Sequence, residues 1–205
     1  MMNDTLSSSF FSKDDNIFGL SYKDWITKWC QWFYGKNDNT KELECECVDN
    51  VYFLGTKLTL PYNNIVFDAF DKIPSDKAIL INTGKWTALG LPFVSSSSEL
   101  LDLAKKRMDS LEDYKVLLNN VPTKPERVTS DMFKIKVNRN IEGHEDPVLG
   151  HMPSIKKGKY NAVIDGYWLF IKPNTLTKRD YQINSFTSCK TGILSLNVNH
   201  NLTIF

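Results

Sequence analysis

The sequence predicts a mostly β protein, a two-sheet β-sandwich or jelly-roll-like domain with two short helices. Short runs rich in β-branched and aromatic residues recur between Pro, Asn, Asp and Gly, and only two segments show helical periodicity. A doubly wound α/β fold would need helices alternating with the strands throughout. The 205 residues, 41% of them apolar, suit a single domain spanning 1–205. The polar segment 1–16 is expected to be flexible.

The first helix is predicted over 22–34. Ser21 is its expected N-cap, Asp24 stands three residues later as in a capping box, and Gly35 suits its end. Its apolar residues follow helical spacing and form one aromatic stripe. The second helix is predicted over 98–110, with Ser98 as the N-cap, acidic residues in the first turn and basic residues near the end.

Nine strands are predicted, and the intervening segments are short except for one. The strands are expected over 51–54, 57–60, 65–70, 78–81, 114–118, 133–137, 162–171, 181–186 and 192–204. Within the seventh, Asp165 and Gly166 indicate a turn or a strand irregularity. The segment 138–159 is the longest predicted loop, and loops of that length are usually functional or mobile.

The charge balance argues against several classes of function. The chain carries 25 Lys+Arg against 24 Asp+Glu, a formal net charge of +1, so it has no global field to attract a phosphate backbone. We therefore expect no nucleic-acid partner. No apolar run reaches the roughly 18 residues that a membrane span needs, and the first 16 residues lack a signal-peptide core. These observations predict an intracellular or virion protein.

Aromatic residues are the first candidate ligand-binding group. Aromatic faces stack on sugars, and the candidates for a sugar platform are Trp25, Trp29, Trp86, Tyr167 and Trp168. The other interpretation is that the helix stripe packs against a sheet and that Trp168 belongs to a central core strand. A sugar platform requires at least one tryptophan that is exposed in a concave site.

A cluster in the long loop is the best enzymatic candidate. His144, Glu145, Asp146 and His151 could bind a divalent cation or orient an imidazole as a general base. The alternative is a solvated acidic loop with two surface histidines. The sequence has no phosphate-binding loop, dinucleotide fingerprint or nucleophile elbow. We therefore assign no catalytic residue and expect no cofactor.

Several motifs carry a resemblance to a known group of proteins. They are FGLSYKDWITKWCQWFYG at 18–35, VYFLGT at 51–56, PSDKAILINTGKW at 74–86, DGYWLFIKP at 165–173 and SCKTGILSLNVNHNLTI at 188–204. Their order resembles that of an uncharacterised family of bacterial and archaeal proteins, which also extends to large DNA viruses. The resemblance implies a mostly β domain and no established activity. Many such proteins look secreted and have a cysteine after the VYFLG-like strand, whereas residues 57–61 here contain none.

Three functional hypotheses follow from the sequence. The first is a non-enzymatic structural or attachment protein that acts through its surface, as a component of a viral particle or other large assembly, with protein partners or self-association. The second is a carbohydrate-binding module that uses exposed tryptophan. The third is a metal-assisted hydrolase centred on 142–151.

Overall fold

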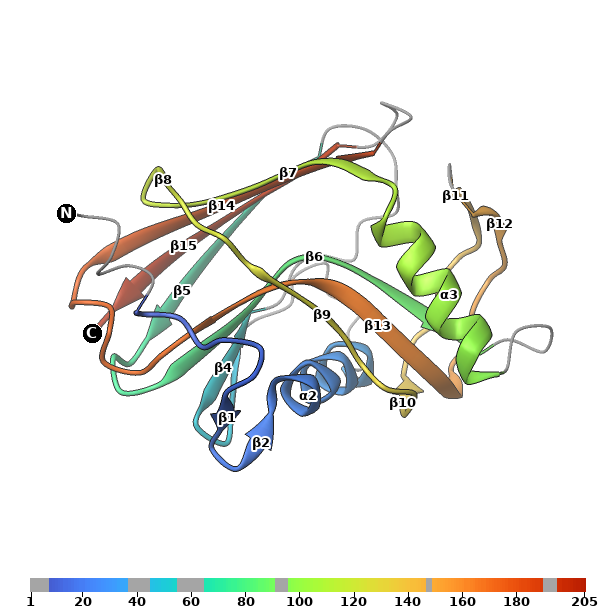
Figure 1. Cartoon of the computed structure of the whole chain (residues 1–205), viewed down its shortest axis with the longest axis horizontal. Helices are drawn as coiled ribbons and strands as arrows, with labels where there is room; N and C mark the ends of the chain where they lie inside the picture. Colours follow the sequence, from blue (N-terminus) through green and yellow to red (C-terminus); the bar gives the residue numbers. More distant parts are fainter. Residues whose placement is uncertain (1–7, 37–44, 55–64, 91–95, 147–148, 190–194) are drawn as a thin grey trace.

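A computed structural model describes residues 8–36, 45–54, 65–90, 96–146, 149–189 and 195–205; for 65–70, 144–146, 150, 189 and 195–197 the description covers the backbone alone. The part of the chain that it describes is mostly β, with two mixed sheets and two helices, which confirms the predicted two-sheet β-sandwich (Figure 1). None of the described helices is long and apolar enough to cross a membrane.

The first sheet has six strands, in the order β10-β13-β6-β4-β3, with β9 also paired to β13. Its strands are β3 (Glu46–Val48), β4 (Val51–Leu54), β6 (Ala78–Leu89), β9 (Glu126–Thr129), β10 (Phe133–Val137) and β13 (Gly158–Ile171). The second sheet has the order β5-β15-β14-β7-β8. Its strands are β5 (Ile65–Ile73), β7 (Leu111–Leu118), β8 (Val121–Pro122), β14 (Asp180–Cys189) and β15 (Ser195–Ile204). The pairs β4·β6 and β15·β5 are parallel.

Two small hairpins complete the described strands. β1 (Asn16–Ile17) pairs with β2 (Leu20–Ser21), and β11 (His144–Asp146) pairs with β12 (Gly150–Met152). The second hairpin lies within the segment predicted to be a loop. Backbone hydrogen bonds between Ile141 and Ile155, both 2.8 Å from N to O, extend its pairing towards the first sheet.

Helix α2 (Tyr22–Gly35) covers the face of the first sheet that points away from the second sheet (Figure 1). It begins as predicted, because the Ser21 hydroxyl accepts a hydrogen bond from the Asp24 amide and the Asp24 carboxylate accepts one from the Ser21 amide, with N to O distances of 3.2 and 3.0 Å. Its aromatic stripe packs onto Phe53 and Trp168. The stripe is therefore part of the core.

The opposite face of the first sheet packs against the second sheet. Alternation along the strands separates the two cores: Leu80 and Phe170 face α2, whereas Ile81 and Leu169 join Ile183 of β14 between the sheets. Helix α3 (Ser97–Met108) packs on Ala88 and Val163 at the end where the sheets diverge (Figure 1).

Most predicted elements are present, with corrections at their ends. The strands over 51–54 and 133–137 have the predicted bounds, and the predicted strand 57–60 lies outside the described residues. The N-cap of α3 is Ser96, not Ser98. The Ser96 hydroxyl accepts a hydrogen bond from the Glu99 amide, and the Ser96 amide donates one to the Glu99 carboxylate, which is the reciprocal pair of a capping box. Flexibility of segment 1–16 stays a prediction, although Phe11 donates a 2.8 Å backbone hydrogen bond to Phe170.

The turn or strand irregularity predicted at Asp165 and Gly166 does not fall at these two residues. Both residues lie in regular antiparallel pairing with β6 and β9, and the register shift falls later, between Tyr167 and Trp168. Gly166 is required by crowding: a Cβ there would lie 2.6 Å from the Gly84 carbonyl oxygen and 2.8 Å from the Lys85 Cβ. A continuous strand thus carries the DGYW motif through the centre of the first sheet.

Candidate functional site

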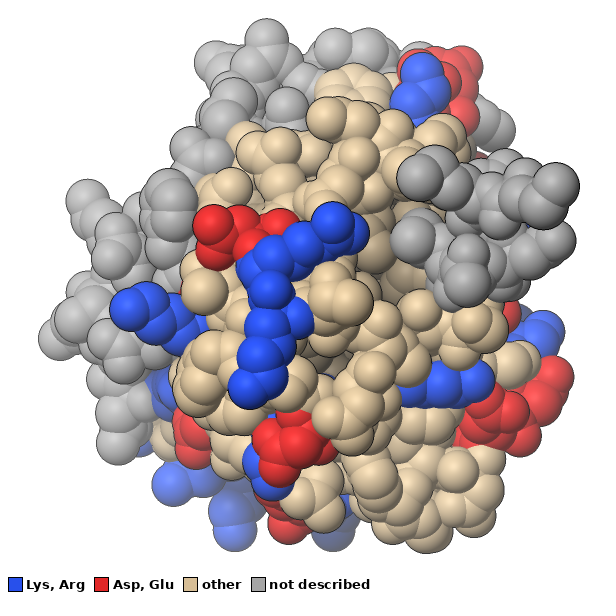
Figure 2. All heavy atoms as spheres, turned by 90° about the vertical axis from the view of Figure 1, so that its left-hand side faces the viewer, with Lys and Arg blue, Asp and Glu red and all other residues tan. Residues whose placement is uncertain are grey.

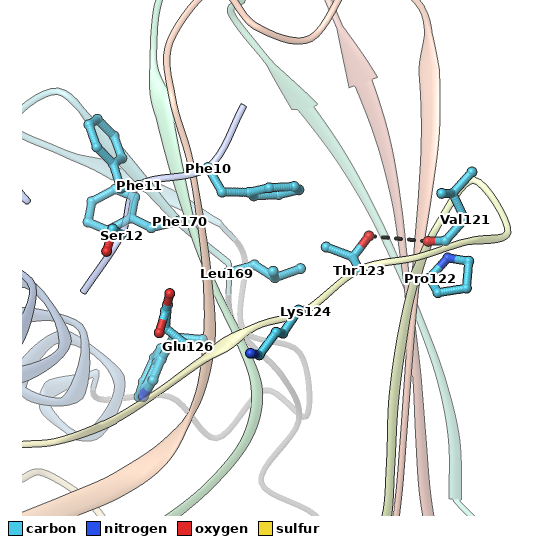
Figure 3. A pocket seen from close by; sticks show the side chains of 11 residues that line it. Phe10, Phe11, Ser12, Val121, Pro122, Thr123, Lys124, Glu126, Leu169 and Phe170 are labelled. Carbon is cyan, nitrogen blue, oxygen red and sulfur yellow. Dashed lines mark hydrogen bonds between the residues drawn. The ribbon is translucent and has the colours of Figure 1, made fainter. Parts of the chain in front are cut away.

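A pocket of about 410 Å³ opens at the edge of β13 (Figure 3). Three segments far apart in sequence line it: residues 10–12 of the N-terminal segment, residues 121–126 around the β8–β9 connection, and residues 168–170 of β13. Phe10 and Leu169 point into it from one side and Pro122 and Thr123 lie across from them. The pocket volume falls at the lower end of the range for small-ligand sites.

The pocket exists because β13 changes its edge partner at this point. β9 pairs with β13 only as far as the Glu126–Trp168 pair. The N-terminal segment then bridges β13 at Phe10 and Ile171, held by backbone hydrogen bonds from Phe11 to Phe170 and from Lys172 to Ser9, each 2.8 Å from N to O. The two partners leave β13 in different directions, and the space between them is the pocket.

Two charged side chains of opposite sign stand at the rim. Lys124 is exposed and Glu126 is half-buried, and both line the pocket. Tyr22 lies close by and donates a long hydrogen bond of 3.4 Å to the Trp168 carbonyl oxygen. Burial and the nearby carboxylate of Glu126 raise the pKa of Tyr22 well above its usual value, so this phenol stays protonated. The pocket thus offers an apolar floor with a cation and an anion beside it.

An ion pair between a half-buried arginine and a buried aspartate adjoins the pocket on β9 and β13. Asp165 is fully buried, and its oxygens accept hydrogen bonds from Arg127 Nη2 at 2.6 Å and from Thr129 Oγ1 at 3.0 Å. Arg127 Nη1 also lies 2.6 Å from a carboxylate oxygen of Asp109, at the end of α3. Hydrogen bonds to Asp165 and Asp109 raise the pKa of Arg127. This cluster ties α3 and β9 to β13, and both oxygens of Asp165 are engaged in it.

The structure separates the five predicted aromatic ligand residues into two groups. Trp25, Trp29 and Trp168 are at most 1% exposed, so they form core contacts and offer no face to a sugar. Trp25 and Trp29 donate through their ring nitrogens to the carbonyl oxygens of Ile17 and Leu54 at 2.7 and 3.0 Å. The prediction of these three as platform residues is therefore wrong, because the helix stripe and the DGYW strand pack against each other.

Trp86 and Tyr167 are half-buried, and their contacts with α3 and β7 place them on the face of the first sheet that points away from α2. The guanidinium of Arg107 lies 5.3 Å from the Trp86 ring centroid, and the Tyr114 ring stacks on Tyr167 at 4.1 Å between centroids. Each ring therefore already has a neighbour over one face.

The predicted metal cluster lies on the β11–β12 hairpin. Its backbone register sets Glu145 opposite His151 and His144 opposite Met152, while the side chains of 144–146 lie outside the described part. Among the described residues, no group of three His, Cys, Asp or Glu side chains is placed to hold a metal ion. The metal site on this hairpin stays a prediction. Among the described residues, Cys30, Cys45 and Cys47 form no disulfide bond.

Lys85 is an unusual residue that the sequence interpretation did not single out. Its ammonium lies 4.6 Å from the Phe33 ring centroid and 5.4 Å from that of Trp29. Burial lowers the pKa of Lys85 to about 8. The signal available in the sequence was a single charged residue within the otherwise uncharged strand 78–89. The pocket residues Phe10, Lys124 and Glu126 carried no such signal.

In comparisons with known proteins, no family model, curated protein or solved structure matches the chain.

Proposed function

We propose that this chain is a non-enzymatic structural or attachment protein, a subunit of a larger assembly such as a viral particle, that works through its surface. The observation that carries the proposal is the pocket at the edge of β13, with Phe10 and Leu169 in its wall and Lys124 and Glu126 at its rim. Interface anchors are commonly apolar or aromatic side chains that fill such pockets, surrounded by a polar rim.

The strongest charged cluster near the pocket supports binding rather than chemistry. Arg127 and Thr129 of β9 donate hydrogen bonds to Asp165 of β13 within the first sheet, which fixes β9 and so one wall of the pocket. A rigid wall favours recognition because little ordering is needed on binding. The near-neutral net charge suits a subunit that packs against similar subunits.

The two alternatives are weaker and can be tested beside it. The carbohydrate-binding module retains only Trp86 and Tyr167 of its five candidates, each with one face covered. The metal-assisted hydrolase depends on four residues of the β11–β12 hairpin, His144, Glu145, Asp146 and His151.

Native mass spectrometry of the untagged protein, with and without a chelator and a reductant, tests the proposal. We expect a metal-free homo-oligomer whose mass does not change with the chelator. A monomer that carries one chelatable divalent ion would contradict the proposal and support the hydrolase. In that case the double variant His144→Ala and His151→Ala should lose the ion.

A further inference from the structure

The turn between β1 and β2 exposes the aromatic ring of Phe18, although the backbone of this residue has an unfavourable left-handed conformation. Phe18 and Gly19 form a two-residue hairpin loop and both have positive φ, 53° and 85°. Such turns strongly favour Asn-Gly, because a bulky side chain is disfavoured in the left-handed region. Phe18 is nevertheless 49% exposed. Strain that is kept at an exposed residue is a reason to look for a function.

The exposed ring stands beside the pocket. Its centroid is 6.5 Å from that of Phe11, which lines the pocket, and 6.3 Å from that of Trp25, with both pairs packed edge to face. Phe11 therefore contacts the projecting ring of Phe18 and is itself one of the residues that line the pocket. Val121, another pocket residue, is 36% exposed on the far wall.

We propose that this surface is a self-association site in which Phe18 of one copy fills the pocket of a second copy. A projection and a pocket that lie next to each other are self-complementary: a two-fold axis between them puts each Phe18 over the other copy's pocket. This inference rests on the proposed function and names the partner as a second copy of this chain.

The charges near Phe18 and at the pocket rim allow a contact between two copies. Lys124 is exposed at the pocket, and Asp14 is exposed four residues before Phe18. The two-fold arrangement brings the surroundings of each Phe18 to the rim of the other pocket, so these opposite charges would face each other. The end of the molecule that carries β8 and the C-terminus shows basic and acidic side chains next to one another around a largely uncharged area (Figure 2).

The variant Phe18→Asn separates the role in association from any role in the fold. Asn-Gly is the preferred sequence for this turn, so we expect an unchanged or higher melting temperature. The dimer loses two anchors at once, so its Kd should rise about 100-fold or more. Met132→Asn is the matched control, since Met132 is 43% exposed and does not line the pocket. Sedimentation equilibrium measures each Kd.

A mixing experiment tests the reciprocal geometry. Val121→Asp places a charge in the pocket wall and should weaken association as Phe18→Asn does. When the two variants are mixed, the heterodimer keeps one intact contact, the Phe18 of one chain in the unaltered pocket of the other. Native mass spectrometry should therefore show more heterodimer than either homodimer.

The outcomes distinguish the inference from the proposed function. A wild-type oligomer that persists in Phe18→Asn, or an equal mixture without excess heterodimer, would overturn this site and leave the assembly proposal standing. A monomeric wild type at high micromolar concentration would overturn both.

Discussion

The carboxylate of Asp165 is completely buried, and the guanidinium of Arg127 supplies its counter-charge. Arg127 holds it with a 2.6 Å contact while also reaching Asp109, whose side chain is 62% exposed. A buried ion that loses its partner is costly, whereas an exposed ion pair contributes little because water screens it. The two ends of the same arginine should therefore differ greatly in their contribution to stability.

We predict that Arg127→Met lowers the free energy of unfolding by about 3–5 kcal/mol, because it leaves Asp165 buried without a counter-charge. Asp109→Asn, at the exposed end, should cost less than about 1 kcal/mol. Adding Asp165→Leu to Arg127→Met should recover most of the loss. Urea denaturation measures all three variants, and equal losses for Arg127→Met and Asp109→Asn would contradict this assignment.

The start of α3 gives a prediction for a whole element. The Ser96 hydroxyl accepts a hydrogen bond from the Glu99 amide, 3.2 Å from N to O, and thereby caps the helix. Ser96→Ala should therefore cost about 1 kcal/mol. Ser98→Ala is the control inside the first turn and should change stability by only a few tenths of a kcal/mol. Hydrogen exchange of the α3 amides measures the effect of both variants. A larger loss of protection in Ser98→Ala than in Ser96→Ala would show that Ser98 is the N-cap, as the sequence predicted.

The elements that the sequence predicted well are those with a local pattern. Alternating or helical apolar spacing located α2, β4 and β10, and the capping-box spacing at Ser21 located the start of α2. β9 was missed because its residues, Glu-Arg-Val-Thr, form a strand through long-range pairing with Asp165 and its neighbours. The pocket was missed for a related reason. Residues near 10, 123 and 169 meet only through the sheet topology, which no local pattern contains.

Across the whole molecule, three layers share one central sheet. α2 packs on one face of the first sheet and the second sheet packs on the other, so loss of the central strands would expose both cores. His200 on β15 lies on the buried side of the second sheet, 1% exposed, and neither of its ring nitrogens has a hydrogen-bond partner among the described residues. Protonation of this imidazole would place an unpaired charge in the interior.

We predict that this histidine makes the fold sensitive to mild acid. Burial lowers the pKa of His200 to about 4, whereas the unfolded chain binds this proton near its ordinary pKa of about 6.5. The unfolded state therefore binds more protons between these values, and stability falls as the pH drops from about 6.5 towards 4, by about 3 kcal/mol in all. Above pH 6.5 the residue has no such effect. His200→Leu should remove this part of the pH dependence, while His151→Gln, at an exposed histidine, should keep it. Urea unfolding at intervals from pH 7.5 to 4.5 measures the slope, and a wild-type slope in His200→Leu would show that other groups control the acid response.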